Sequence, residues 1–286
     1  IWEQMQLAWH YKADRIWIVN VGDLKPMEFP IDFFLRMAWN PDAFNADNLQ
    51  QFTTDWAAQQ FGAAHAPAIA SLLHTYTAHN GRRKPEAIEP DSYSIFHYGE
   101  AERISTELAQ AEALADQLQQ QLAPQLQDAY VQLVAHPLKA SRAVFELNRA
   151  VAMNQLHAQQ GRASTNYWAE RVKYWFDADA KLTAQYHSLG NGRWNHMMSQ
   201  PHLGFIYWRA PDANRMPTLA TLEAAAVAEM GVMAEGSALY WPATDYKAQQ
   251  LTLDSFYPQG QTQRDIEVFN RGTKAFPFTA KASEDW

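Results

Sequence analysis

The sequence of 286 residues contains no cysteine. This absence excludes disulfides, thiolate zinc sites and cysteine nucleophiles together. A chain of this length can bury a core without disulfides in either an oxidising or a reducing compartment, so the redox compartment stays open.

Basic residues are few, with 23 Lys and Arg against 31 Asp and Glu, which gives a formal net charge of −8. The longest basic run is the "RRK" at residues 82–84. Surfaces that bind nucleic acids carry clustered positive charge. We therefore expect neither DNA nor RNA as a partner.

Long hydrophobic runs and familiar catalytic motifs are also missing. No apolar run approaches the roughly 18 residues that span a bilayer, so we expect no membrane partner. The sequence has no HExxH, no glycine-rich phosphate loop, no GxSxG and no EF-hand loop. His196 and His202 are six residues apart, which does not place them on one helical face, and no third ligand accompanies them. We predict no metal site and no cofactor.

The first 39 residues have the pattern of an α/β unit. Residues 1–13 have one apolar helical face, the apolar and mostly β-branched residues 16–19 indicate a strand buried on both sides, and a second helix follows Pro30. A single such unit cannot close its own sheet. We therefore expect the sequence to be a piece of a longer protein that supplies more strands.

Residues 41–190 are rich in Ala and Gln and have helical periodicity. Apolar residues recur at a spacing of three or four at Ile104, Leu108, Ala111, Ala115, Leu118 and Leu122. A second set with helical spacing comprises Val144, Leu147, Val151 and Leu156. Pro124 and Pro137 indicate helix starts, and the "STN" at residues 164–166 is typical of an N-terminal cap. These patterns predict an antiparallel helical bundle.

The C-terminal part has the alternation of β-structure. Ile266 and Val268 precede a turn at residues 270–272, and Phe276 and Phe278 follow it, which predicts a β-hairpin. Two strands alone are marginally stable, so we expect further strands to complete a larger sheet.

The segment "IWIVNVGDLKPMEFP", residues 16–30, joins the predicted strand to a polar tail. The polar residues are Asn20, Asp23, Lys25 and Glu28. At the carboxyl end of a strand in a parallel barrel or doubly wound sheet, they would face a binding site. The local alternative is that Asp23 caps a turn at Gly22 while Lys25 pairs with Glu28 at the surface.

A second polar cluster, "EPDSYSIFHYGEAER", occupies residues 89–103 between helices. Its Tyr93, His97 and Tyr98 could belong to a loop that closes over a polar ligand. The alternative is an ordinary turn followed by a surface pair between Glu100 and Arg103. Residues 192–208, rich in Trp and Met, indicate a packed junction.

Five segments together carry a family resemblance: "IWEQMQLAW", "RIWIVNVGDLKPMEFPIDFFLRMAWNP", "EPDSYSIFHYGEAER", "GRWNHMMSQPHLGFIYW" and "RDIEVFNRGTKAFPFTAKASEDW". In content and order they resemble glycoside hydrolase family 115, the xylan α-1,2-glucuronidases. The resemblance implies a multidomain α/β plus α plus β protein. Residues 1–39 would be the last strand and helices of a catalytic (β/α)8 barrel, residues 40–215 a helical bundle domain, and residues 216–286 the entry into a C-terminal β-sandwich.

The activity implied by the resemblance is inverting hydrolysis that removes α-1,2-linked (4-O-methyl)glucuronic acid from glucuronoxylan. Inversion requires an acid and a base on opposite faces of the sugar. The resemblance places both on earlier barrel strands, upstream of Ile1, so no catalytic residue is assigned and the 286 residues alone are expected to be inactive.

The resemblance makes the polar tail part of a substrate pocket. We expect Asn20 to bind a sugar hydroxyl or the carboxylate, Lys25 to bind the carboxylate, and Asp23 or Glu28 to bind hydroxyls or orient Lys25. Tyr93, His97 and Tyr98 are weaker candidates for a lid.

The resemblance also implies a homodimer as the intact protein, with glucuronoxylan or its oligosaccharides as partners. A polysaccharide substrate favours a periplasmic or extracellular location. The alternative function is a non-catalytic helical scaffold for dimerisation, or a carbohydrate-binding module.

Overall fold

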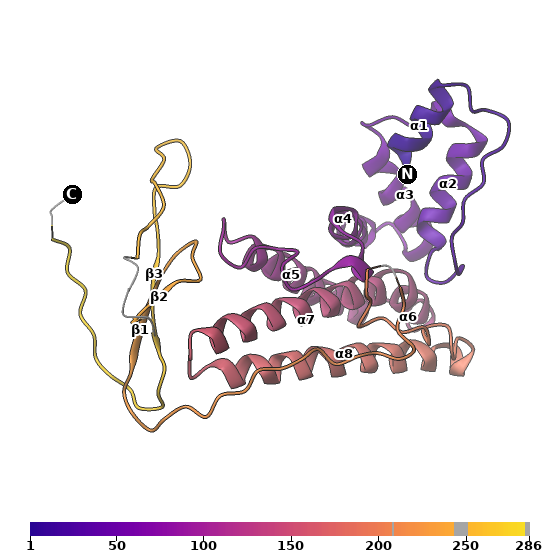
Figure 1. The fold of residues 1–286 in the computed structure, drawn as a ribbon. Coiled ribbons are helices and arrows are strands. Elements are labelled where there is room, and N and C mark those ends of the chain that lie inside the picture. The colour runs from indigo at the N-terminus through magenta and orange to yellow at the C-terminus, as the bar shows by residue number, and fades with distance from the viewer. Residues whose placement is uncertain (208, 243–250, 284–286) are drawn as a thin grey trace. The chain divides into compact units, whose positions relative to one another are not determined.

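The computed structural model describes residues 1–207, 209–242 and 251–283 (Figure 1). The chain forms two compact units, each built from three separate segments. Unit 1 comprises Ile1–Ala87, Thr106–Val144 and Ala178–Ala213, and unit 2 comprises Ile88–Ser105, Phe145–Asp177 and Asn214–Trp286. Within the described ranges, no helix has both the length and the apolar character needed to cross a bilayer.

The N-terminal part of unit 1 is helical, and its elements are α1 (Trp2–His10), α2 (Glu28–Trp39), a 3-10 turn at Pro41–Ala43, α3 (Leu49–Phe61), α4 (Ala66–Arg82) and a 3-10 turn at Pro85–Ala87. Aromatic rings fill the space between α2 and α3. Phe33 lies 5.1 Å from both Phe44 and Phe52, and Phe29 lies 5.0 Å from Trp56, measured between ring centroids. Such edge-to-face contacts add to the energy of burial.

The strand predicted for residues 16–19 is absent. These residues belong to no strand, and Ile16, Ile18 and Val19 are 79%, 89% and 47% exposed. A strand with apolar residues on both faces is stable only between neighbouring strands that accept its hydrogen bonds and layers that cover it. No described residues provide these for 16–19, so the barrel stays a prediction.

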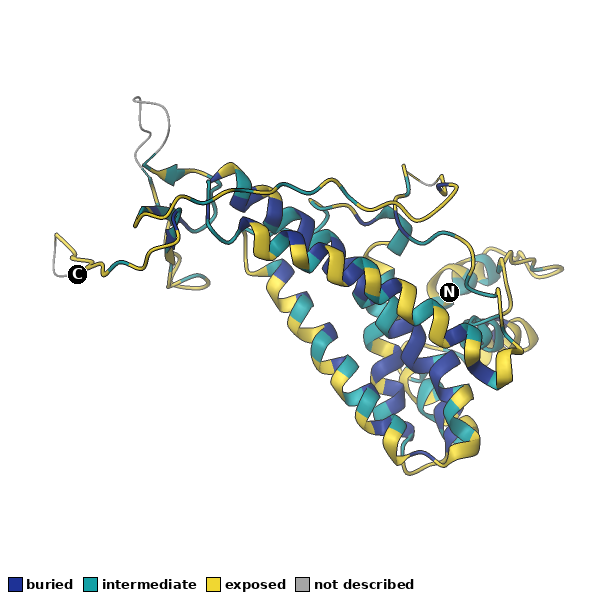
Figure 2. Ribbon diagram, turned by 90° about the horizontal axis from the view of Figure 1, so that it is seen from below, coloured by how far each residue is buried: buried dark blue, intermediate teal, exposed yellow. Residues whose placement is uncertain are grey.

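The helical prediction for the middle of the chain is confirmed. The elements are α5 (Glu100–Gln121), α6 (Pro124–Tyr130), a π-helical turn at Val131–Ala135, α7 (His136–Gln159) and α8 (Thr165–Gly192). All ten apolar residues of the two predicted helical faces are buried. In Figure 2 buried residues recur along the long helices between exposed ones.

The π-helical turn stands directly before Pro137. Proline has no N–H to donate, and within an α-helix its ring would clash with the carbonyl four residues earlier. The wider turn accommodates that ring, and such turns often lie at functional sites. His136 is the first residue of α7 after it.

Unit 2 contains a three-stranded antiparallel sheet in the order β2-β1-β3, formed by β1 (Met230–Ala234), β2 (Tyr240–Trp241) and β3 (Ile266–Asn270). Val232 of β1 pairs with Trp241 of β2 and with Val268 of β3. The sheet is consistent with the predicted β-region, whereas a β-sandwich stays a prediction.

The predicted hairpin partner of residues 266–270 is wrong, because β3 pairs with β1 and Phe276 and Phe278 belong to no strand. After the turn, the N–H of Thr273 donates to the carbonyl of Ala225 (3.0 Å) and that of Lys274 to the carbonyl of Val227 (3.1 Å). Gly272 permits this approach, since a Cβ there would lie 2.0 Å from the Val227 oxygen. Local alternation could not reveal this non-local pairing.

Candidate functional site

Unit 1 contains a cleft of about 600 Å³, which we call the unit 1 cleft. Its walls come from residues 21–27, the C-terminal half of α4, residues 85–86, the first turns of α7, Asp179 of α8, and residues 197–205. The cleft therefore collects side chains from six separate segments of the sequence.

Two of the four residues predicted in the polar tail reach this cleft. Asp23 and Lys25 line it, whereas Asn20 and Glu28 do not. Asn20 accepts a hydrogen bond at Oδ1 from the N–H of Gly22 (3.0 Å). This is the local turn that the sequence alternative assigned to Asp23, and Gly22 at φ +63° suits it.

Lys25 forms an ion pair with Glu28, as the local alternative predicted. Its Nζ also lies 4.7 Å from the centroid of the Trp194 ring, within range of a cation–π contact. The Lys25 side chain is 24% exposed and that of Glu28 is 31% exposed, so the pair is partly shielded from water. The charge of the ammonium is therefore already compensated within the protein.

His202 and Asp179 form a second polar pair on the cleft wall. Nδ1 of His202 lies 3.0 Å and 3.1 Å from the two carboxylate oxygens of Asp179, whose side chain is only 4% exposed. A carboxylate at Nδ1 favours the tautomer that carries its proton there and fixes the orientation of the ring. The other ring nitrogen, Nε2, is then a hydrogen-bond acceptor while the imidazole is neutral.

His136 lines the cleft but is only 6% exposed. Burial lowers its pKa to about 4, the positive charge on protonated His202 adds to this, and Asp179 opposes it. Its ring packs 4.8 Å from that of Tyr186. His136 is therefore a neutral imidazole at physiological pH, and no described residue forms a hydrogen bond with its ring nitrogens.

The pKa of Tyr186 is raised to about 12, first by burial and second by the negative charge of Glu28. Its hydroxyl has no hydrogen-bond partner in the described part of the chain. Tyr186 thus stays protonated and supports the His136 ring by packing.

Asn80 and Ser141 add uncharged polar groups to the cleft. Nδ2 of Asn80 donates to Oγ of Ser141 (3.1 Å), which donates to the carbonyl of Pro137 (2.8 Å). Oδ1 of Asn80 is buried without a partner among the described residues. Burial raises the pKa of the neighbouring Tyr76, opposed by its hydrogen bond to Asn80, so this phenol is also uncharged.

His136 and Asp179 were not predicted as site residues, and His202 was considered only as a metal ligand. Asp179 and His202 are 23 residues apart and meet only through the packing of residues 197–205 against α8. The proline after His136 was a visible signal of a distorted helix start, although not of a cleft. Within the described ranges, no three His, Cys, Asp or Glu residues are arranged to hold a metal ion.

Tyr93, His97 and Tyr98 belong to unit 2. Tyr93 lines a different cleft of about 650 Å³ and packs 5.5 Å from Phe145, between ring centroids. His97 lies against Gly236, where a Cβ would be 3.5 Å from its ring, and Tyr98 is 78% exposed. Their role as a lid stays a prediction.

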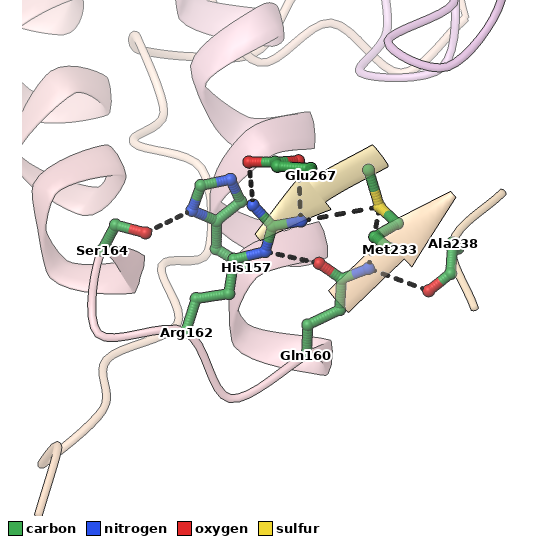
Figure 3. Close-up of polar contacts among 7 residues, drawn as sticks. All are labelled: His157, Gln160, Arg162, Ser164, Met233, Ala238 and Glu267. Carbon is green, nitrogen blue, oxygen red and sulfur yellow. Dashed lines mark hydrogen bonds and ion pairs between the residues drawn. The ribbon is translucent and has the colours of Figure 1, made fainter. Parts of the chain in front are cut away.

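Unit 2 also contains a buried polar network centred on Arg162 (Figure 3). Its guanidinium donates to both carboxylate oxygens of Glu267 (2.5 and 3.0 Å) and to Oε1 of Gln160 (2.6 Å), and it lies 3.8 Å from the centroid of the Phe269 ring. Gln160 in turn donates to the carbonyl of Ala238 (2.9 Å). This network joins the α7–α8 loop to the sheet, and Ala238 at its edge also lines the cleft that contains Tyr93.

Comparisons with known proteins give two findings. The family model described as "Glycosyl hydrolase family 115" matches residues 1–87. A solved family GH115 4-O-methyl-α-glucuronidase, described as having specificity for decorated arabinogalactans, has a TM-score of 0.60 and 24% sequence identity. The match covers 80% of this chain and 31% of that one, so the chain spans about a third of the length of that protein. No curated protein matches the sequence.

The structural likeness shows a shared fold, and the family model covers the segment that carries Asp23 and Lys25. Residues 1–87 thus resemble glycosyl hydrolase family 115, and the chain shares its fold with a solved member of that family.

Proposed function

We propose that the protein containing this chain is a glycoside hydrolase that removes α-linked glucuronic acid, or its 4-O-methyl ether, from a plant polysaccharide with inversion. The observation that carries the proposal is the family match over residues 1–87. The similar fold of a solved 4-O-methyl-α-glucuronidase supports it.

Two polysaccharides are candidate substrates. The sequence resemblance favours glucuronoxylan, with α-1,2-linked glucuronosyl groups on xylose. The solved relative is described as having specificity for decorated arabinogalactans. A glucuronidated arabinogalactan is therefore the second substrate to be tested. We propose xylan as the substrate to be tested first.

We assign the catalytic acid and base to residues outside this chain. An inverting site needs two carboxyl groups about 6.5–9.5 Å apart with a water between them. The part of this chain that matches covers only 31% of the solved relative, so that relative has many further residues in which such groups can lie. The chain alone is therefore expected to be inactive.

The polar tail is proposed to form part of the substrate-binding region. Asp23 and Lys25 line the cleft and can contact sugar, while the turn at Asn20 and the ion pair of Glu28 hold the loop in place. We further propose a homodimer acting in a periplasmic or extracellular setting, as expected for a polysaccharide substrate.

The test is to express the full reading frame that contains this chain and to measure glucuronic acid release from glucuronoxylan and from glucuronidated arabinogalactan. Residues 1–286 expressed alone serve as the control. We expect release by the longer protein and none by the control. Absence of release from both polysaccharides by a folded longer protein would overturn the proposal, and release by residues 1–286 alone would overturn the assignment of catalysis elsewhere.

A further inference from the structure

The inner wall of the unit 1 cleft presents uncharged hydrogen-bonding groups. His136 is only 6% exposed, and burial keeps its imidazole neutral. None of the described residues forms a hydrogen bond with its ring nitrogens. Oδ1 of Asn80 is likewise buried without a described partner. A buried polar atom without a partner, such as this Asn80 oxygen, is uncommon, because it costs free energy until something hydrogen-bonds to it. A ligand with hydroxyl groups would satisfy both.

The charges that face the cleft disfavour an anion. Three carboxylates line it, those of Asp23, Glu86 and Asp179, against a single ammonium, that of Lys25. Lys25 is already paired with Glu28, and Asp179 with His202. The remaining carboxylates, on Asp23 and Glu86, would repel a uronate.

From this arrangement we propose that the unit 1 cleft binds the uncharged backbone sugars of the polysaccharide, with His136 and Asn80 hydrogen-bonding to their hydroxyls, and that the uronate group lies outside it. The nature of the ligand as a sugar rests on the proposed function. The preference for an uncharged sugar over an acidic one rests on the cleft itself.

The binding test uses residues 1–286 and three probes: xylotriose, galactotriose and free glucuronate. Titrations are followed by the NMR signals of the histidine rings. We expect at least one neutral trisaccharide to bind and to shift the His136 signal, with glucuronate at least about tenfold weaker, the effect of one lost or opposed hydrogen bond. Raising NaCl from about 0.05 M to about 0.5 M should leave the affinity for the neutral sugar unchanged, since screening acts on charges.

Two variants locate the site. His136→Gln and Asn80→Ala should each weaken binding of the neutral trisaccharide about tenfold. The matched control is His74→Gln, an exposed histidine on α4 outside the cleft, which should bind as the unmodified chain does. Circular dichroism of each variant checks that the helices are retained, and Asn80→Ala keeps the test decisive if His136→Gln fails to fold.

The outcomes separate this inference from the proposed function. Glucuronate binding as tightly as the trisaccharides, no binding of any probe, or unchanged binding in both cleft variants would overturn the inference. If the full reading frame releases glucuronic acid while residues 1–286 bind no neutral sugar, only the inference fails. If residues 1–286 bind neutral sugars while the full protein releases no glucuronic acid, the proposed function fails.

Discussion

The two units each bury a set of polar residues, but they satisfy them differently. In unit 2, Arg162 has a bidentate carboxylate, an amide oxygen and an aromatic face around its guanidinium. In unit 1, His136 and the Asn80 side-chain oxygen face a cleft without described partners for those atoms. A saturated network stabilises a fold, whereas polar groups left open toward a cleft are suited to binding a ligand.

The largest expected effect comes from breaking the saturated network. Arg162→Met should lower the free energy of unfolding by about 2 kcal/mol, because it leaves the buried Gln160 without its partner, whereas the half-exposed Glu267 regains water. The matched control is Lys173→Met, which removes the exposed pair with Glu170 and should cost less than about 0.5 kcal/mol. Urea unfolding followed by circular dichroism measures both. Equal effects in the two variants would contradict a structural role for Arg162.

The second prediction concerns the pH dependence of stability. In each unit, burial lowers the pKa of one histidine to about 4; these are His136 in unit 1 and His157 in unit 2. In the unfolded chain each has a pKa near 6.5, so between pH 6.5 and pH 4 the unfolded state binds more protons. Stability must therefore fall as pH is lowered through that window, by about 2 kcal/mol per histidine between pH 7 and pH 5.

The pH prediction is checked by comparing unfolding free energies at pH 7 and pH 5 in the unmodified chain, His136→Phe and His157→Phe. Each variant should lose about 2 kcal/mol less than the unmodified chain does over this range. A histidine variant with the same pH dependence as the unmodified chain would show that the residue is not held neutral by the fold.

The third prediction tests the polar tail in the intact enzyme. Lys25→Ala should lower kcat/KM about tenfold, through the loss of one sugar contact, while thermal stability changes little because the broken pair is partly exposed. Lys173→Ala is the control with unchanged kinetics.

The smallest expected effect is that of Asn20→Ala. Asn20 does not line the cleft and acts through the turn at Gly22, so we expect about a threefold loss of kcat/KM. Unchanged steady-state kinetics for both Lys25→Ala and Asn20→Ala would show that the polar tail has only a structural role.

The sequence correctly predicted those features that depend on residues close together in the chain. The spacing of Ile104 through Leu122 determined which face of α5 is buried, and the i, i+3 spacing of Lys25 and Glu28 led to their ion pair. Where the outcome depends on distant segments, the prediction failed. Residues 16–19 have strand chemistry but no neighbouring strands, and β3 pairs with β1 rather than with the residues after its own turn.

In the candidate site, too, locally determined features could be predicted and contacts between distant segments could not. Asp23 and Lys25 could be found because polar residues directly follow an apolar run. The pair of Asp179 and His202, and the burial of His136, arise from packing between segments far apart in the chain. Neither spacing nor composition encodes those contacts in a single sequence.

The most direct test of the account measures stability and sugar binding together in His136→Phe and Arg162→Met of residues 1–286. Replacing a neutral buried ring by an apolar one of similar shape should change the unfolding free energy at pH 7 by less than about 1 kcal/mol, while binding of the neutral trisaccharide falls about tenfold. Arg162→Met should lose stability and, below its unfolding transition, bind with unchanged affinity. If His136→Phe instead unfolds the chain and binds sugar normally where folded, the unit 1 cleft is a structural feature and the account is contradicted.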